Sequence, residues 1–299
     1  KDYDKEFFKK YEKDYNFETQ MMFFFYAVAT LLFIYSAVKY YTDRPALFMA
    51  IYALIPYLFW NSMGAIRNYL AIAIVFWGSR FLVEKRLFLY MIAIALATSV
   101  HMSASIFFVL AFFLKQRYSL KIHFFLALVC FALSISEMSF SLMNWLLTWL
   151  GSKYAAYLLS ALSTSLGLEN ILVSTTLWLT AIYLLRKEYQ KPQGDPKAIV
   201  IANMATFSFA AMEFFYFSYE LERIRDYGFP FLVVALILVL DRCIGERFRE
   251  AASSLCLAFM VVLFLMFVNI YGNNIDGRTS MSLSAGNIHY EFNFALLEK

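Results

Sequence analysis

The stretch Met21 to Val38, MMFFFYAVATLLFIYSAV, contains no charged residue and decides the class of fold. It has the length that a helix needs to cross the hydrocarbon core of a bilayer, which is about 17–25 residues. Similar apolar runs follow near 45–60, 66–83, 87–99, 102–114, 122–137, 170–186, 198–217, 228–241 and 252–271. The pattern predicts an all-α, polytopic membrane helix bundle of about ten passes. The short runs 87–99 and 102–114 are either two passes or one re-entrant pair.

Composition supports the same class of protein. Of the 299 residues, 62% are hydrophobic, 20% are aromatic and 16% are charged. A soluble domain has about 45–50% apolar and about 25% charged residues, so a single integral membrane domain over 1–299 is expected. The net charge of +4 is spread over many short segments, which argues against a nucleic-acid partner. Cysteine spacing and the absence of metal and dinucleotide motifs predict no metal and no cofactor.

Basic residues set the expected orientation, because lysine and arginine accumulate in cytoplasmic loops. With the N-terminus outside, the inner loops hold Lys39, Arg44, Lys85, Arg86, Lys115, Arg117, Lys121, Arg186, Lys187, Lys191, Lys197, Arg242, Arg247 and Arg249. The outer connections between spans hold only Arg67, Lys153, Arg223 and Arg225. The N-terminal segment 1–19 and the tail 272–299 then lie outside. Because the chain starts at Lys1 with a polar segment, we expect that a further N-terminal span precedes it.

The connection 139–169 lies on the outer side and is rich in apolar residues. Its aromatic and aliphatic residues recur at helical spacing: Leu142, Trp145, Leu146, Trp149, Leu150, Tyr154, Tyr157, Leu158 and Ala161. This pattern predicts an amphipathic helix that lies in the outer interface. One more short span is the alternative interpretation.

Arg67 begins an apolar run on the outer side, within the stretch Ile66 to Ala71. A helix N-terminus combined with a guanidinium group is a site for an anion. The alternative is an arginine whose side chain only reaches the interface.

His101 lies at the outer turn between two short apolar runs. A neutral imidazole there accepts a proton or orients a hydroxyl, and a protonated one binds phosphate. A hydrogen-bonded packing role is the alternative for this histidine.

A second polar group, Arg223, Arg225 and Asp226, lies at another outer boundary. Arg223 and Asp226 are spaced to share one helical face. We interpret the group as a diphosphate clamp held by carboxylates, or else as a local ion pair with Glu220 or Glu222. Glu213, late in an apolar run, is expected to pair with an arginine of another helix.

These stretches occur in a familiar order. Ile66-Arg67-Asn68-Tyr69-Leu70-Ala71 is followed by Val100-His101-Met102-Ser103-Ala104, by Ser152-Lys153-Tyr154-Ala155-Ala156-Tyr157 and by Arg223-Ile224-Arg225-Asp226-Tyr227. The order resembles the EpsG-like family of Wzy-type polysaccharide polymerases across nearly the whole chain. The family pattern is closer to Ile-Arg-Gln-x-x-Ala at the first site, so Asn68 departs from it.

The resemblance implies a metal-independent membrane glycosyltransferase of the bacterial cytoplasmic (inner) membrane, similar in fold to C-type membrane glycosyltransferases. Such enzymes polymerise exopolysaccharide, capsule or O-antigen at the extracytoplasmic face, with polyprenyl-diphosphate-linked oligosaccharides as substrates. Membrane lipid and a protein that regulates chain length are the other expected partners.

The candidate residues fit these roles. Arg67, Arg223 and Arg225 would bind the diphosphate, with Arg67 also catalytic. His101 would orient or deprotonate the acceptor hydroxyl, and Asp226 is the second candidate base. Aromatic platforms for the glycan are Trp145, Trp149, Tyr154 and Tyr157.

Three other functions remain open at this level. A transporter or flippase of lipid-linked sugars should show two related halves, which the sequence does not show clearly. A glycan ligase or acyltransferase would bind the same donor. A purely structural membrane subunit is the third alternative.

Overall fold

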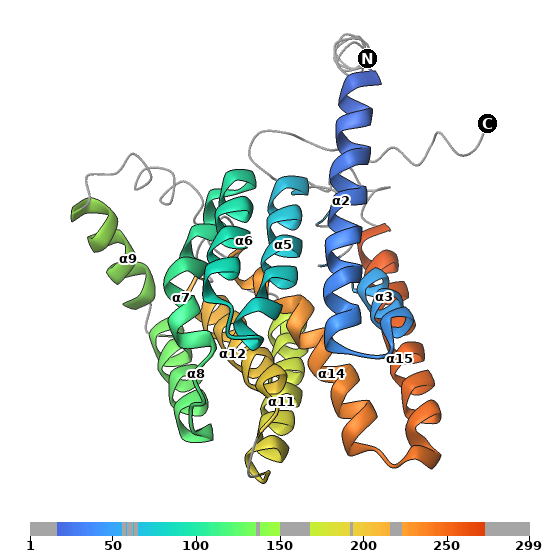
Figure 1. The fold of residues 1–299 in the computed structure, drawn as a ribbon. Coiled ribbons are helices and arrows are strands. Elements are labelled where there is room, and N and C mark those ends of the chain that lie inside the picture. The colour runs from blue at the N-terminus through green and yellow to red at the C-terminus, as the bar shows by residue number, and fades with distance from the viewer. Residues whose placement is uncertain are drawn as a thin grey trace.

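The structure is a computed structural model that describes residues 17–55, 58, 62, 65–135, 138–149, 168–191, 194–215 and 223–272. Within these ranges every regular element is helical, which confirms the predicted all-α class (Figure 1). The elements are α2 Phe17–Tyr41, α3 Pro45–Leu54, α5 Ile66–Val83, α6 Leu87–Val100, η1 Met102–Ser105, α7 Ile106–Leu114, α8 Leu120–Ile135, α9 Met138–Trp149, α11 Leu168–Tyr189, α12 Pro196–Phe214, η2 Arg225–Gly228, α14 Phe229–Cys243 and α15 Glu246–Gly272. Each predicted apolar run overlaps at least one of these helices.

The length and apolar composition of several helices indicate a membrane protein. Four described segments are long and apolar enough to cross a bilayer: Met21–Tyr41, Ile66–Val83, Pro196–Phe214 and Glu246–Leu265. Two more pass the same test only together, across a bend of 84°: Leu120–Ser134 and Met138–Trp145. Three apolar helices are shorter: Pro45–Leu54, Leu87–Val100 and Met102–Leu114. The larger number of passes expected from the sequence stays a prediction.

The core of the bundle is built around α5, which is buried along most of its length and packs against α2 and α6. A Cβ added to Gly78 of α5 would lie 2.8 Å from the Cβ of Ala93 on α6. Small residues of this kind let helices approach closely inside a membrane. Phe76 of α5 stacks on Tyr41 of α2 and meets Phe231 of α14 edge-on, with ring centroids 5.6 and 4.8 Å away.

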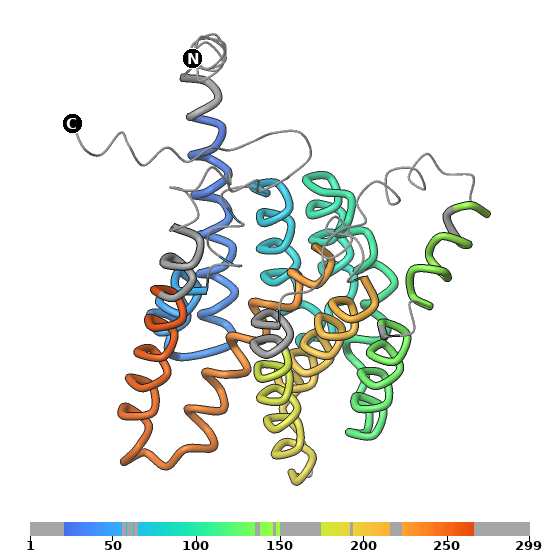
Figure 2. Tube along the Cα trace, turned by 180° about the vertical axis from the view of Figure 1, so that it is seen from behind, coloured from blue at the N-terminus to red at the C-terminus, as the bar shows by residue number. Residues whose placement is uncertain are grey.

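The periphery of the bundle exposes large apolar side chains. Phe25 on α2, Phe125 on α8 and Leu255 on α15 are each more than half exposed. These helices lie on the outside of the bundle in the view from behind (Figure 2). Side chains of this kind on outer helices are expected to contact lipid tails.

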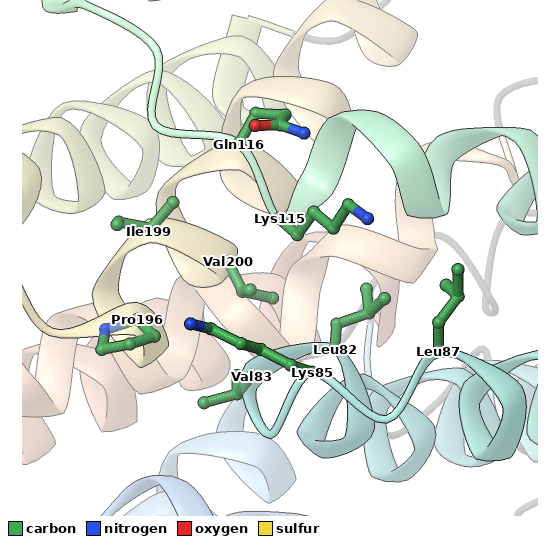
Figure 3. A pocket seen from close by; sticks show the side chains of 9 residues that line it. All are labelled: Leu82, Val83, Lys85, Leu87, Lys115, Gln116, Pro196, Ile199 and Val200. Atoms are coloured by element: carbon green, nitrogen blue, oxygen red, sulfur yellow. The ribbon is translucent and has the colours of Figure 1, made fainter.

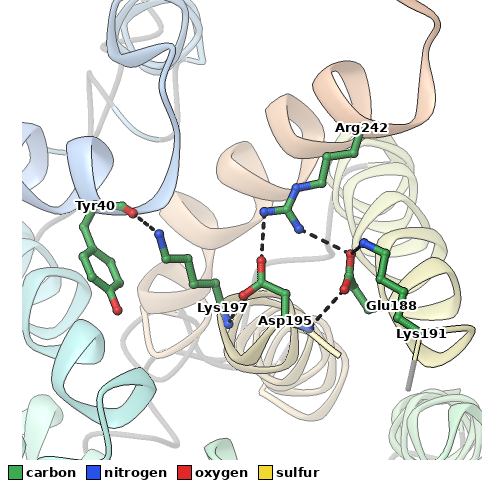
Figure 4. Close-up of polar contacts among 6 residues, drawn as sticks. All are labelled: Tyr40, Glu188, Lys191, Asp195, Lys197 and Arg242. Carbon is green, nitrogen blue, oxygen red and sulfur yellow. Dashed lines mark hydrogen bonds and ion pairs between the residues drawn. The ribbon is translucent and has the colours of Figure 1, made fainter. Parts of the chain in front are cut away.

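An ion network joins α11, α12 and α14 at one end of the bundle (Figure 4). The buried carboxylate of Glu188 accepts hydrogen bonds from Lys191 Nζ at 2.7 Å, from Arg242 Nη1 at 3.3 Å and from the backbone N–H of Asp195 at 3.0 Å. Arg242 Nη2 also donates to Asp195 Oδ2 at 2.8 Å. Burial opposes the charge of Glu188, but these donors and the charges of Lys191 and Arg242 outweigh it and lower the pKa of the carboxyl.

Two further contacts tie the outer helices to the same end. Lys197 Nζ, at the start of α12, donates to the carbonyl of Tyr40 at 2.5 Å. Arg44, between α2 and α3, donates to Glu250 Oε1 at 2.6 Å and to Ser253 Oγ at 2.7 Å on α15. The loops that the sequence assigns to the inner side therefore meet at one end of the bundle, which we call the basic end.

Helix α9 begins the connection that was predicted to hold an interfacial helix. It is set at a steep angle to α8 and lies at the edge of the bundle (Figure 1). Its Trp145 and Trp149 side chains are 66% and 73% exposed. Exposed tryptophans of this kind are typical of a helix that lies in a membrane interface. The rest of the connection, the segment 1–16 and the tail 273–299 lie outside the described residues.

Candidate active site

A chain of hydrogen bonds links three segments at the end of the bundle opposite the basic end. The backbone of His101 is extended, with φ −148° and ψ 122°, and it ends α6 before η1 begins. The Nδ1 atom of His101 lies 2.7 Å from Ser103 Oγ. Ser103 Oγ in turn lies 2.8 Å from the hydroxyl of Tyr227 on η2 and donates to Asn68 Oδ1 on α5 at 3.4 Å. We call these residues, together with Asp226, the polar cluster.

Asp226 is buried next to Tyr227, which belongs to this chain of hydrogen bonds. Its Oδ2 accepts a hydrogen bond from the hydroxyl of Tyr69 on α5, and its Oδ1 accepts one from Arg225 Nε, both at 3.4 Å. The guanidinium of Arg225 also lies 5.5 Å from the ring centroid of Phe229. Asp226 is therefore held by donors from two elements, and the charge of Arg225 balances its own.

The position of η2 depends on a close approach to α12. Ser208 Oγ donates to the carbonyl of Arg225 at 2.7 Å. A Cβ added to Gly228 would lie 2.1 Å from the Cβ of Ser208 and 2.9 Å from the carbonyl oxygen of Met204. Only glycine fits there, because the backbone of η2 lies directly against α12.

The predicted diphosphate ligands differ in exposure. Arg67 is exposed in the first turn of α5, whose N-cap residue Ala65 provides no side-chain cap. Arg223 is half-buried in the turn before η2, and its carbonyl accepts the N–H of Asp226 at 3.2 Å. Arg225 is only 5% exposed and pairs with Asp226. Arg67 and Arg223 are thus the predicted cations that a ligand reaches first.

The structure brings only part of the predicted site together. His101 and Asp226 lie in the polar cluster, whereas the exposed Trp145 and Trp149 lie on α9, which packs against α8. Tyr154 and Tyr157, as well as Glu220 and Glu222, fall outside the described residues.

Glu213 differs from expectation. It is buried on α12, and it forms no ion pair with any residue in the described ranges. The expected arginine of another helix is therefore not among them. Across the same ranges, no three histidine, cysteine, aspartate or glutamate side chains are grouped to hold a metal ion.

Sequence reasoning missed several residues that form or support the polar cluster. Ser103 and Tyr227 supply its central hydrogen bond, Tyr69 holds Asp226, and Ser208 and Gly228 set the position of η2. Ser103, Tyr227 and Tyr69 do lie in the short stretches that carry the resemblance. Their uncharged hydroxyls gave no electrostatic signal that would separate them from packing residues.

Comparison with known proteins identifies a family. A family model described as the EpsG family matches residues 7–290, which is nearly the whole chain. No curated protein and no solved structure matches. The chain therefore belongs to the EpsG family, whose members are membrane proteins associated with polysaccharide biosynthesis.

Proposed function

We propose that this protein is a polysaccharide polymerase of the Wzy type. It would transfer a polyprenyl-diphosphate-linked glycan onto a second lipid-linked repeat unit at the extracytoplasmic face of the bacterial cytoplasmic membrane. The observation that supports this most is the polar cluster, in which stretches around Arg67, His101 and Asp226 meet although they are far apart in the chain.

His101 is the proposed general base. The acceptor hydroxyl attacks the anomeric carbon of the donor sugar, the bond from that carbon to the phosphate oxygen breaks, and the hydroxyl proton passes to His101 Nε2. Ser103 holds the other ring nitrogen, and this contact orients the imidazole. Asp226 is the second candidate, but both of its carboxylate oxygens already accept hydrogen bonds, from Tyr69 and from Arg225.

The leaving polyprenyl diphosphate carries its charge away without protonation, so the protein needs fixed positive groups. Arg67 would bind it together with the uncapped N–H groups at the start of α5. Arg223 would contact it from the turn before η2. Arg225 is buried and paired with Asp226, so it would contribute less to binding the diphosphate than Arg67 and Arg223.

The proposed topology follows from the same arrangement. The cluster lies at the start of α5 and the end of α6, whereas the basic end includes the α5–α6 turn, so the positive-inside rule would predict an outer position for the cluster. The short helices would complete a bundle of about ten passes, similar to C-type membrane glycosyltransferases. Helix α9 would then lie in the outer interface, where Trp145 and Trp149 are available to stack on the growing glycan.

Incubation of purified protein with a lipid-linked repeat unit tests the proposal directly, with products separated on a gel. A ladder of products identifies a polymerase, and a product with a single addition identifies a ligase. Movement of the unchanged repeat unit across a vesicle membrane identifies a flippase. The last two results would overturn the proposed reaction.

Two variants test the assigned residues in this assay. Arg67→Lys should cut elongation strongly, since lysine cannot form a bidentate pair with phosphate. The matched control is Arg186→Lys, the same change at an exposed position on α11. His101→Ala should abolish product while donor binding is kept. Wild-type polymer length in either site variant would remove that residue from the mechanism.

A further inference from the structure

A cavity of about 290 Å³ opens at the basic end, where the α5–α6 turn, the end of α7 and the start of α12 meet. Its walls are mainly apolar and include Leu82, Val83 and Val200. Lys85 and Lys115 also line it, and Figure 3 shows Lys85 extending toward Pro196 and Lys115 toward Leu87, with Val200 and Leu82 between them. The cavity thus combines an apolar wall with two cations.

The backbone places Lys85 in an unusual conformation. Its φ is +61°, in the left-handed region that favours glycine. The N–H of Arg86 donates to Phe81 O at 2.7 Å and the N–H of Lys85 to Leu82 O at 3.1 Å, which is the Schellman pattern that ends many helices. Glycine is the usual residue at this position, so a lysine held there suggests a use for its side chain.

Neither cation of the cavity is neutralised nearby. Lys85 and Lys115 form no ion pair with any residue that the structure describes, and no carboxylate lines the cavity. The adjacent Glu84 pairs instead with Arg86, at 3.5 Å. A ligand that enters the cavity therefore meets a positive potential, which favours an anion.

The surroundings of the cavity are apolar and open. Phe88, beside the lining residue Leu87, is 77% exposed, and Phe112 is 52% exposed. Lys115 Nζ lies 5.8 Å from the ring centroid of Phe112. In a bilayer such side chains contact acyl chains. A lipid whose anionic head group is bound between the lysines can therefore keep its acyl chains in the bilayer.

We propose that this cavity binds the phosphate head group of an anionic phospholipid from the adjacent leaflet. The flexible stems of Lys85 and Lys115 let both ammonium groups turn toward one phosphate. Leu82, Val83 and Val200 contact the glycerol and the first carbons of the acyl chains. Basic pockets between membrane helices bind lipid head groups by this chemistry. The site is independent of the polar cluster and of the proposed reaction.

Native mass spectrometry of the full chain in detergent tests the proposal with three probes. Phosphatidylglycerol should remain bound, phosphatidylcholine with the same acyl chains should bind much more weakly, and glycerol 3-phosphate should not compete. Equal retention of both lipids would overturn the anionic site. Full competition by glycerol 3-phosphate would show a site for a soluble phosphate and overturn the assignment to lipid.

Variants locate the site. Lys85→Asn with Lys115→Gln removes both charges, and asparagine tolerates the left-handed backbone of residue 85. We expect phosphatidylglycerol to bind about 25-fold more weakly, as the product of about fivefold for each lysine near an anionic surface. The matched control is Lys121→Gln with Lys187→Gln, which removes two charges from exposed positions outside the cavity. An equal loss in both double variants would mean diffuse charge attraction and would overturn the proposal.

A filling variant covers the case in which the double variant fails to fold. Val200→Phe occupies the cavity and keeps both lysines. Phosphatidylglycerol binding should fall at least as far as in Lys115→Gln alone, for which we expect about fivefold. Unchanged binding to a well-folded Val200→Phe protein would show that the lipid lies elsewhere.

Discussion

Gly228→Ala tests whether η2 lies directly against α12. The added methyl group would lie 2.1 Å from the Cβ of Ser208, 2.7 Å from its Oγ and 2.9 Å from the carbonyl oxygen of Met204. The hydroxyl of Ser208 can rotate away, but its Cβ and the Met204 carbonyl belong to the helix and cannot. One of the two backbones must therefore move.

The size of this movement sets the expected effect. An ordinary contact at such a Cβ is 3.4–4 Å, so η2 must shift by more than about 1 Å from α12. Overpacking of this kind costs about 1–3 kcal/mol of stability. The shift also separates Tyr227 from Ser103, now 2.8 Å apart, and through Ser103 it releases the imidazole of His101. A misplacement of about 1 Å at a reacting group lowers turnover about 100-fold.

The assay combines polymer length on a gel with thermal unfolding in detergent. Gly245→Ala is the matched control, because nothing lies within 4 Å of a Cβ added there. We expect the Gly228→Ala protein to have an unfolding temperature several degrees lower than that of the wild type and to make little polymer, while Gly245→Ala behaves as the wild type. If both variants matched the wild type, the close approach of η2 to α12 would be refuted, and with it the positioning of the polar cluster.

Four other predictions follow from particular contacts. Since the pKa of Glu188 is lowered by folding from its ordinary value of 4.5, its contribution to stability is complete above about pH 4.5 and is lost as the pH falls through the folded pKa; Glu188→Gln should flatten this loss in acid unfolding curves. Ser103→Ala should lower kcat more than it raises KM, because the Ser103 hydroxyl contacts the His101 imidazole that we propose as the general base; an unchanged pH–rate profile would argue against this. Thr206→Val should lower the free energy of unfolding by about 1–3 kcal/mol, measured by thermal unfolding, because the Thr206 hydroxyl is hydrogen-bonded to the buried side chains of His123 and Trp178. A cysteine at Ser152 should react with an impermeant reagent in intact cells, and labelling only after lysis would invert the topology.

Much of the fold was predictable from local pattern. Each apolar run overlaps a helix, and the run 66–83 coincides with α5. The number of passes was not settled in this way, because α3 and α6 are too short to identify a span by length alone. Whether such a helix crosses the membrane depends on neighbours that cover its ends, which hydropathy does not describe.

The candidate site was predictable only in its charged members. Arg223 and Arg225 have the same chemistry in the sequence, yet one is half-buried in a turn and the other is buried against Asp226. Arg223 lies in the turn before η2 whereas Arg225 is the first residue of η2, so the two side chains have different surroundings. Charge alone therefore did not show which arginine a ligand reaches first.

The sequence by itself indicated that this chain belongs in a membrane, and it predicted that the basic loops lie on one side. The free energy of transferring a segment from water to lipid is nearly a sum over its residues, so composition and residue order suffice to predict it. Only the tertiary structure decided that Ser103 meets Tyr227, that Gly228 lies against Ser208, and that Lys85 and Lys115 line one cavity. Such meetings depend on how distant helices pack, and packing is a property of the whole bundle rather than of any one segment.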